Sequence, residues 1–228
     1  MNRLEINNLN MSYKHKVLDN LNLSLESGQI VGLVGENGTG KSTLLRILAG
    51  LEMTYSGEVL VNGEKPSANT KSFVSYQPDR FSLDERLSVK ETMETYANFF
   101  EDFNETKFKS LLADFKLPFD SKIKEMSRGM KEKVQIALSL SRDAELYLLD
   151  EPISGVDPAS RKIIIDAILK NFEEDSLLIV STHLINAIEP LLDRVLFLSD
   201  GKIFLNETVD YIRDEKKMSL EDYFTEVF

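Results

Sequence analysis

Apolar residues in the first third of the chain either alternate with polar residues or follow one another in short runs, and both patterns are typical of strands. Turn residues such as Gly and Asn separate these runs. The pieces together predict an antiparallel β layer. The predicted strands cover residues 3–9, 21–34, 58–64 and 72–76, with a Glu-Ser-Gly turn inside the second.

The periodicity changes to that of amphipathic helices between about residues 84 and 143. Ser88 and Glu91 fit a capping box, in which side chain and backbone cap each other at a helix start. A second helix fits residues 105–116 and ends before a Leu-Pro pair, and a third begins near Ser127. This stretch therefore predicts a helical segment inserted into the chain.

Apolar runs typical of strands return in the last third of the chain, separated by helical stretches. Parallel strands need long crossover connections, which are usually helices. The alternation therefore predicts a mostly parallel sheet and an α/β fold. The runs cover residues 146–150, 177–181 and 195–199.

Composition narrows the function classes. The chain of 228 residues is long enough for one α/β unit with a substantial core. Its formal net charge of −11 argues against extended contact with nucleic-acid phosphates, so we expect no nucleic-acid partner. The sequence has no cysteine, no apolar run near the ~20 residues that span a bilayer, and no signal-peptide pattern at its start. We therefore expect a cytosolic chain without disulfides.

The clearest chemical motif is Gly-Glu-Asn-Gly-Thr-Gly-Lys-Ser-Thr, which satisfies the phosphate-binding pattern G-x-x-x-x-G-K-[ST]. In this pattern backbone N–H groups close around phosphate oxygens, Lys41 reaches the β- and γ-phosphates, and the Ser42 hydroxyl can bind Mg²⁺. A buried-strand pattern precedes the motif and a helical pattern follows it, so a helix dipole adds to phosphate binding. The predicted nucleotide-binding residues are Gly35, Glu36, Asn37, Gly38, Thr39, Gly40, Lys41, Ser42 and Thr43.

A second motif, Leu-Tyr-Leu-Leu-Asp-Glu at residues 146–151, ends a buried strand with two carboxylates. The carboxyl ends of such strands are where α/β folds bind ligands. Asp150 would hold Mg²⁺, directly or through water. Glu151 would orient or deprotonate the water that attacks the γ-phosphate. The alternative, a strand followed by a solvated acidic turn, is weakened by the phosphate loop in the same chain.

Three isolated residues carry weaker signals. His183 follows a predicted strand, where an imidazole can reach a γ-phosphate or its attacking water, although a lone histidine there is more often a surface or cap residue. Gln77 precedes a proline, a position that usually marks only a turn. Tyr13 falls on the same face of an extended segment as Leu9 and Met11, so core packing is the alternative to stacking on a base.

In this order the motifs resemble those of the nucleotide-binding subunits of ATP-binding cassette (ABC) transporters. The resemblance covers essentially the whole chain and implies a single domain of residues 1–228. Residues 1–78 and 144–228 would form the nucleotide-binding core with its antiparallel β layer, and residues 79–143 a helical subdomain. The family motifs fall, in chain order, on Tyr13, Walker A at 35–43, the Q-loop at Gln77, a signature from Ser127, Walker B at 146–151, a D-loop at 154–157 and a switch histidine at His183.

The bound groups that this resemblance implies are ATP and Mg²⁺. Tyr13 would stack on adenine. Ser42, Gln77 and Asp150 would contact the metal, and Gln77 would also sense a transmembrane permease.

The resemblance also implies a catalytic set of Lys41, Glu151 and His183. Two such subunits, identical or different, would sandwich two ATP molecules. The segment from Ser127 to Met130 of one subunit would close over the ATP held by the other. The closing and opening of this dimer would drive a permease at the inner face of the cell membrane.

The signature departs from the family norm Leu-Ser-Gly-Gly-Gln and reads Met-Ser-Arg-Gly-Met. Ser127 and Gly129 still supply a hydroxyl and backbone amides at a helix N-terminus, which makes an anion site. Arg128 replaces a glycine and would either bind the γ-phosphate or face solvent. Asp157 is a D-loop residue by resemblance, yet an Asp before Pro158 also fits a helix N-cap.

Similar Ser-x-Gly-Met-Lys signatures occur in single-subunit ATPases of bacterial export permeases, so the resemblance favours export of a peptide, antibiotic or lipid. The alternatives are a soluble ABC ATPase that acts on a macromolecular partner, and a P-loop kinase or GTPase. The second leaves the signature and D-loop unexplained. By family analogy we expect a groove in the helical segment that receives a short permease helix. The tail from Ser219 to Phe224 would pack back on the body or contact a second subunit.

Overall fold

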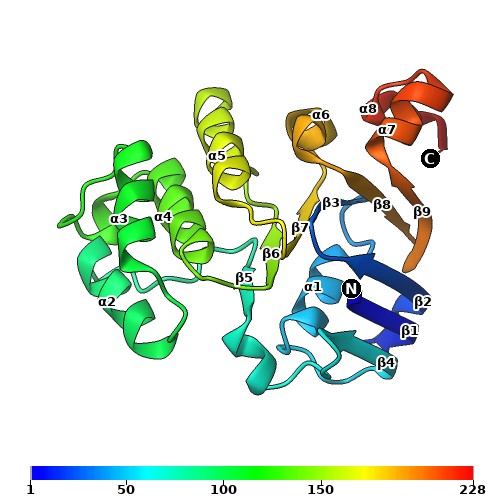
Figure 1. The fold of residues 1–228 in the computed structure, drawn as a ribbon, viewed down its shortest axis with the longest axis horizontal. Coiled ribbons are helices and arrows are strands. Elements are labelled where there is room, and N and C mark those ends of the chain that lie inside the picture. Colours follow the sequence, from blue (N-terminus) through cyan, green and yellow to red (C-terminus); the bar gives the residue numbers. More distant parts are fainter. Residues whose placement is uncertain (1, 228) are drawn as a thin grey trace.

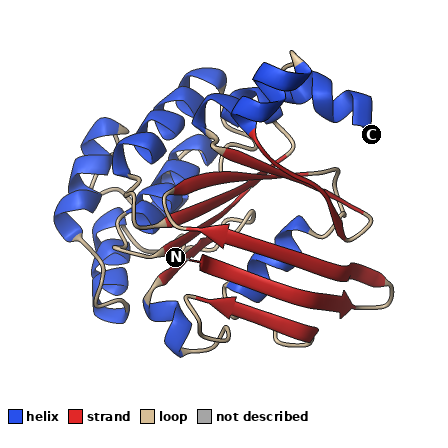
Figure 2. Ribbon diagram, turned by 45° about the vertical axis from the view of Figure 1, so that its right-hand side comes forward, coloured by secondary structure: helices blue, strands red, loops and turns tan. Residues whose placement is uncertain are grey.

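The computed structural model describes residues 2–227, and its centre is a six-stranded sheet with the order β5-β6-β7-β3-β8-β9 (Figures 1 and 2). The five strands from β5 to β8 run parallel, and β9 is antiparallel to β8. The prediction of a mostly parallel α/β sheet is therefore confirmed. In spatial order the strands are Val74–Gln77, Leu146–Asp150, Leu177–Thr182, Gln29–Val34, Arg194–Ser199 and Lys202–Thr208.

A second sheet of three antiparallel strands, in the order β2-β1-β4, lies beside the first (Figure 2). Helix α1, Lys41–Leu48, buries its apolar face in the cluster that the two sheets share. This sheet confirms the predicted antiparallel layer. Its strands are Lys16–Glu26, Asn2–Ser12 and Ser56–Val61.

Three strand predictions need correction. Residues 29–34 and 72–76 were expected in the antiparallel layer, whereas β3 and β5 are parallel strands of the core sheet: β3 lies between β7 and β8, and β5 is the edge strand that pairs with β6. A four-residue apolar run carries no local mark of its partner, and pairing is decided by the rest of the chain. Strand β9 has no counterpart among the predicted strands, since its side chains pack only partly against the core.

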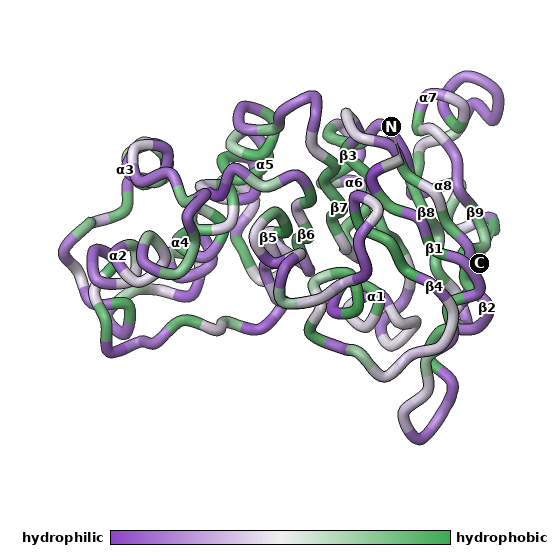
Figure 3. The backbone as a smooth tube through the Cα atoms, turned by 60° about the horizontal axis from the view of Figure 1, so that its bottom comes forward, coloured by the Kyte–Doolittle hydropathy of each residue, from purple (hydrophilic) through white to green (hydrophobic). Residues whose placement is uncertain are grey.

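Buried strands alternate their side chains between the two faces of the core sheet, and each face has its own apolar cluster. Figure 3 shows the same interior strands as hydrophobic and the outer helical turns as hydrophilic. One face, toward the antiparallel sheet, presents Val31, Leu33, Leu146, Leu148, Leu177 and Ile179. The other, toward the helices, presents Ile30, Val34, Tyr147, Leu149, Leu178 and Val180.

The predicted helical segment forms α2, Val89–Phe99, α3, Glu105–Asp114, and α4, Arg128–Leu140 (green in Figure 1). The capping box is confirmed: Glu91 N–H donates to the Ser88 hydroxyl, and the Glu91 carboxylate accepts from Ser88 N–H. Ser127 caps α4, as its place before the helix predicts. These helices occupy the stretch, residues 79–143, that was expected to form a helical subdomain.

Further helices cover the remaining part of the core sheet and end the chain (Figure 1). The apolar tail packs back on the body, as expected: the Phe224 ring meets Phe197 of β8 edge to face at 5.0 Å. No helix within residues 2–227 is long and apolar enough to cross a membrane. The helices are α5, Pro158–Asn171, α6, Ile185–Ile188, α7, Val209–Tyr211, and α8, Leu220–Val227, with short 3₁₀ or π turns at Asn69–Ser72, Ile123–Glu125, Glu189–Leu191 and Ile212–Lys216.

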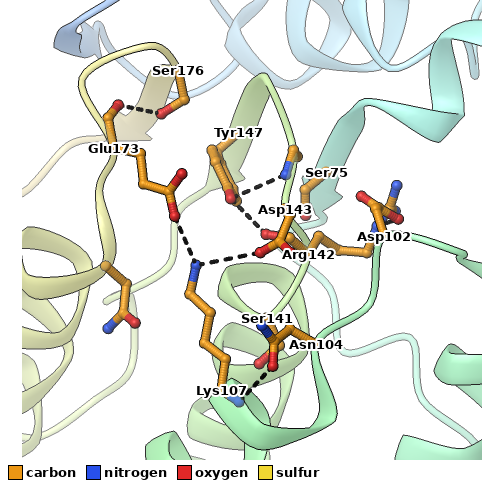
Figure 4. A network of polar contacts seen from close by, with 12 residues as sticks. Ser75, Asp102, Asn104, Lys107, Ser141, Arg142, Asp143, Tyr147, Glu173 and Ser176 are labelled. Atoms are coloured by element: carbon orange, nitrogen blue, oxygen red, sulfur yellow. Dashed lines mark hydrogen bonds and ion pairs between the residues drawn. The ribbon is translucent and has the colours of Figure 1, made fainter.

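Arg142, in the link from α4 to β6, joins the helical segment to the core sheet (Figure 4). Its side chain is almost fully buried. The guanidinium donates to Asp102 Oδ1 at 2.5 Å and to the carbonyls of Lys71 and Ser72 at 2.9 and 3.1 Å. It also lies 3.8 Å above the centre of the Phe100 ring. One side chain thus holds groups from both sides of the junction.

Lys107 of α3 adds a weaker link at the same junction (Figure 4). Its ammonium lies 4.0 Å from Asp143 Oδ1 and 3.9 Å from Glu173 Oε1, just beyond α5. The hydroxyl of Tyr147 donates to the Arg142 carbonyl at 2.5 Å, so strand β6 is tied to the same link.

We expect Arg142→Ala to lower the free energy of unfolding by about 3 kcal/mol, because removal of the buried guanidinium leaves the largely buried Asp102 carboxylate, 19 % exposed, without its cation. Urea unfolding followed by circular dichroism measures this. Arg86→Ala, which removes an exposed arginine paired with Asp84, is the matched control and should keep the wild-type midpoint. A wild-type midpoint for Arg142→Ala would show that the junction does not depend on this side chain.

Candidate functional site

The phosphate-binding pattern forms the loop between β3 and α1. Gly40, the N-cap of α1, has φ +109°, and a Cβ there would lie 2.9 Å from the Leu18 side chain and 3.0 Å from the Val17 carbonyl oxygen. Only glycine fits this position without strain. No side chain caps the first turn of α1. Its N–H groups, which lack partners inside the helix, are therefore available to an anion.

Lys41 lies across this loop rather than pointing into solvent. Its ammonium donates to the carbonyl oxygens of Gly35 at 2.7 Å and Glu36 at 2.9 Å. Burial lowers the pKa of Lys41, and the nearby carboxylates of Glu151 and Asp150 partly oppose that shift. A phosphate at the loop can replace the two carbonyls as the acceptor, so the side chain is placed for the predicted role.

The acidic pair reaches this loop through the sheet. Strand β7 lies between β3 and β6, and all three run parallel, so their carboxyl ends share one edge. Asp150 is opposite Ser181 in the pairing of β6 with β7. The Ser181 hydroxyl donates to Asp150 Oδ1 at 2.5 Å, and the carboxylate is 2 % exposed. The structure thus brings Asp150 and Lys41 together as predicted.

Glu151 leaves the strand in a left-handed backbone conformation, with φ +51°. Such a conformation costs on the order of 1–3 kcal/mol for a residue with a side chain. Its N–H donates to the carbonyl and hydroxyl oxygens of Ser181, each at 3.1 Å, which holds the turn.

His183, just past β7, completes a pair with Glu151. Its Nδ1–H donates to Glu151 Oε2 at 3.0 Å. The histidine side chain is 44 % exposed and the glutamate 10 %, so the pair sits at a solvent boundary. The surface or cap interpretation of His183 misses this contact. The geometry suits a carboxylate that must be oriented toward a water molecule.

The oxygens of Ser42, Gln77 and Asp150 fit the predicted Mg²⁺ site by their chemistry, since Mg²⁺ prefers oxygen ligands and uses few from the protein. Gln77 ends β5 and is 3 % exposed, and among the described residues its Oε1 has no hydrogen-bond partner. A buried amide oxygen without a partner costs free energy unless a cation or donor meets it.

Tyr13 does not pack in the core, so that alternative is wrong. Strand β1 ends at Ser12, and beyond it the alternation that buries Leu9 and Met11 no longer applies. The ring is 57 % exposed, and its hydroxyl donates to Glu52 at 3.0 Å and lies near Thr43. An exposed aromatic ring beside the first turn of α1 is placed for base stacking.

The signature and D-loop residues have partners of their own. The Ser127 hydroxyl accepts from Met130 N–H at 3.3 Å, and Arg128 pairs with Glu132. Asp157 accepts from Ser160 N–H at 3.0 Å and caps α5, so the structural interpretation of this residue holds. Together with Glu151, Arg128 lines a cavity of about 440 Å³ to which residues 35–43 contribute nothing.

Sequence reasoning missed two residues that contact Asp150. Ser181 was predicted only as part of a strand. It lies 31 residues after Asp150 in the sequence, so no local pattern indicates their contact. The other residue is Tyr76. Its pKa is raised mainly by burial and also by the charge of Asp150, so its hydroxyl stays protonated and can donate a hydrogen bond to Asp150. A polar residue at the carboxyl end of a buried strand was the available signal in both cases.

Comparisons with known proteins agree with these motifs. The family model described as ABC transporter matches residues 18–154. The uncharacterized ABC transporter ATP-binding protein MJ1023 of Methanocaldococcus jannaschii is 34 % identical over 88 % of this chain and 75 % of its own length. The lantibiotic transport ATP-binding protein SrtF of Streptococcus pyogenes is 31 % identical over 91 % of each chain.

A solved structure described as the ATP binding subunit of an ABC transporter superposes with a TM-score of 0.86 over 98 % of each chain, at 27 % identity. Because the superposition covers 98 % of this chain, it includes both sheets and the helical segment. The chain belongs to the ABC transporter family, in which it is an ATP-binding and ATP-hydrolysing subunit.

Proposed function

We propose that this subunit hydrolyses Mg²⁺-bound ATP in a sandwich dimer and thereby powers a separate transmembrane permease that exports a peptide, an antibiotic or a lipid. The observation that carries the catalytic half is the contact between His183 and Glu151 at the sheet edge beside the phosphate loop. The chain itself would reside in the cytoplasm and reach the membrane through the permease.

Hydrolysis requires an oriented water molecule and stabilisation of the charge on the transferred phosphoryl group. Glu151 accepts the proton of the water whose oxygen attacks the γ-phosphorus, and the bond to the β,γ-bridging oxygen breaks to release ADP. His183 keeps the Glu151 carboxylate oriented. Lys41 and the N–H groups of the loop hold the β- and γ-phosphates. Mg²⁺, held by Ser42, Gln77 and Asp150, would neutralise phosphate charge.

Glu151→Gln should keep ATP binding and lose at least about two orders of magnitude in turnover, the usual scale for a general base. Steady-state phosphate release measures turnover, and a fluorescent ATP analogue measures binding. Glu94→Gln, at an exposed site on α2, is the control and should behave as wild type. Near-normal turnover in Glu151→Gln would remove this residue from the mechanism.

A dimer is proposed because the segment from Ser127 to Gly129 opens α4, a helix of 13 residues, and is separate from the phosphate loop of its own chain. The amides at such a helix start suit the γ-phosphate of a second copy. Hydrolysis would separate the two copies again.

We expect Glu151→Gln to shift from monomer to dimer when Mg²⁺-ATP is added, because the variant traps the state before hydrolysis. Light scattering after size-exclusion chromatography gives the mass with ATP, with ADP and without nucleotide. A chain that binds ATP yet stays monomeric would refute the homodimer and favour a heterodimer with another ATPase subunit.

The proposed permease contact is a groove at the junction of the core and the helical segment. Two adjoining hollows of about 170 and 490 Å³ share Lys71 and Phe100 in their linings. Leu51 at one end and Phe99 at the other are exposed, the latter by 79 %. Apolar residues open to solvent at a groove suit a short helix from a partner.

Phe99→Ser should abolish co-purification of this chain with an integral membrane protein from detergent-solubilised membranes of its own cells, because it removes an apolar contact from the groove rim. Phe204→Ser, at an exposed phenylalanine on β9, is the control and should retain the partner. Loss in both variants, or retention in both, would count against the groove. A wild-type chain that captures only soluble partners would favour the non-transport ABC ATPase.

The cargo class rests on the signature and on one relative. A Ser-x-Gly-Met-Lys signature is present at residues 127–131. The SrtF relative is named for lantibiotic transport. Both support a cargo such as a peptide antibiotic, which the permease rather than this chain would recognise.

A further inference from the structure

Arg128 stands where the family signature has a glycine, and its side chain turns toward the D-loop of its own chain. The guanidinium lies over the backbone of Gly155, where a Cβ would be only 2.6 Å from Arg128 Cζ and Nη2. Gly155 has φ +79°. The pair fits closely because position 155 carries no side chain.

Glu132 holds Arg128 in this place. Its Oε1 accepts from Arg128 Nε at 2.9 Å, one helical turn along α4. The Glu132 carboxyl is largely buried, and among the described residues its Oε2 has no hydrogen-bond partner. Burial raises the pKa of this carboxyl, and Arg128 opposes that shift. The Arg128 side chain is 75 % exposed, so this ion pair orients the guanidinium but contributes little to stability.

The D-loop beneath the guanidinium is connected directly to Glu151. Ser154 N–H donates to the Glu151 carbonyl at 3.1 Å, and Gly155 is the next residue. Ile153 and Val156 are buried on either side. Arg128, Glu132 and Glu151 also line the same cavity. If the Arg128 guanidinium moves away from Gly155, the turn at residues 151–155 loses the group that covers it. This turn begins at Glu151, so its conformation affects the Glu151 backbone.

We propose that Arg128 and Glu132 are positioning residues that act through Gly155: they couple the signature, which would meet the ATP of the other subunit, to the catalytic Glu151 of the same chain. This inference rests on the proposed sandwich dimer. When the signature binds the nucleotide of the other subunit, Arg128 moves away from Gly155. The D-loop then changes conformation, and this change alters the position of Glu151 in the same chain.

The contact can be observed without ATP. In the ¹H–¹⁵N spectrum of the arginine Nε–H groups, the signal that disappears in Arg128→Ala belongs to Arg128. It should shift in Gly155→Ala and in Glu132→Gln. Gly63→Ala is the matched control, because Gly63 also has φ +79° but has no atom within 4 Å of a Cβ. An unmoved Arg128 signal in Gly155→Ala would overturn the proposal.

The catalytic consequence is tested by a double-mutant cycle on ATP hydrolysis. Arg128→Ala and Gly155→Ala should each lower kcat by about 3- to 10-fold, within the range seen for residues that couple two sites. The KM for ATP should change little in Gly155→Ala, since the proposed contact with the partner's nucleotide is made by the signature segment and not by Gly155. The double variant should be no slower than the slower single variant, because both changes break one contact.

Effects on kcat that multiply in the double variant would overturn the coupling. Glu132→Gln should lower kcat in the wild-type background and have no effect in Arg128→Ala, as expected for a residue that acts through Arg128. The two proposals can fail separately. If the Arg128 signal shifts in Gly155→Ala but the wild-type chain hydrolyses no ATP, the contact is supported and the proposed function is contradicted.

Discussion

The parallel pairing of β6 with β7 places Asp150 opposite Ser181, and the rest of the site depends on that register. A carboxylate that is 2 % exposed needs a donor, and the Ser181 hydroxyl supplies it. The same serine accepts the N–H of Glu151, which turns the chain toward His183. A slip of one residue would point Asp150 into the opposite face of the sheet.

Local patterns in the sequence predicted those features that local chemistry decides. The capping box at Ser88 and the phosphate loop at 35–43 are formed by residues close together in the chain, and both are where the sequence places them. The partner of strand 74–77 was predicted wrongly because its four residues carry no information about β6. Ser181 and Tyr76 were missed for the same reason, since only the folded sheet brings them to Asp150.

Arg142 links the helical segment to the core sheet, so the two parts of the chain are mechanically connected. The helical segment leaves the core after β5 and returns at β6, the two strands that also carry Gln77 and Asp150. A movement of that segment therefore pulls on the strands that end at the proposed metal site. Arg142 restrains the movement through charge-assisted hydrogen bonds in a dry setting, where such bonds are strong. The proposed permease groove beside it is thus connected, through β5 and β6, to the proposed hydrolysis site.

The position of β3 has a consequence for synthesis of the chain on the ribosome. This strand carries the phosphate loop, yet its neighbours in the sheet are β7 and β8, at Leu177–Thr182 and Arg194–Ser199. The nascent β3 therefore has neither sheet partner until most of the polypeptide has been made, and its apolar run must be shielded meanwhile. Nucleotide affinity arises late in translation, so a chain truncated before β7 would lack an ATP site although its Walker A sequence is intact.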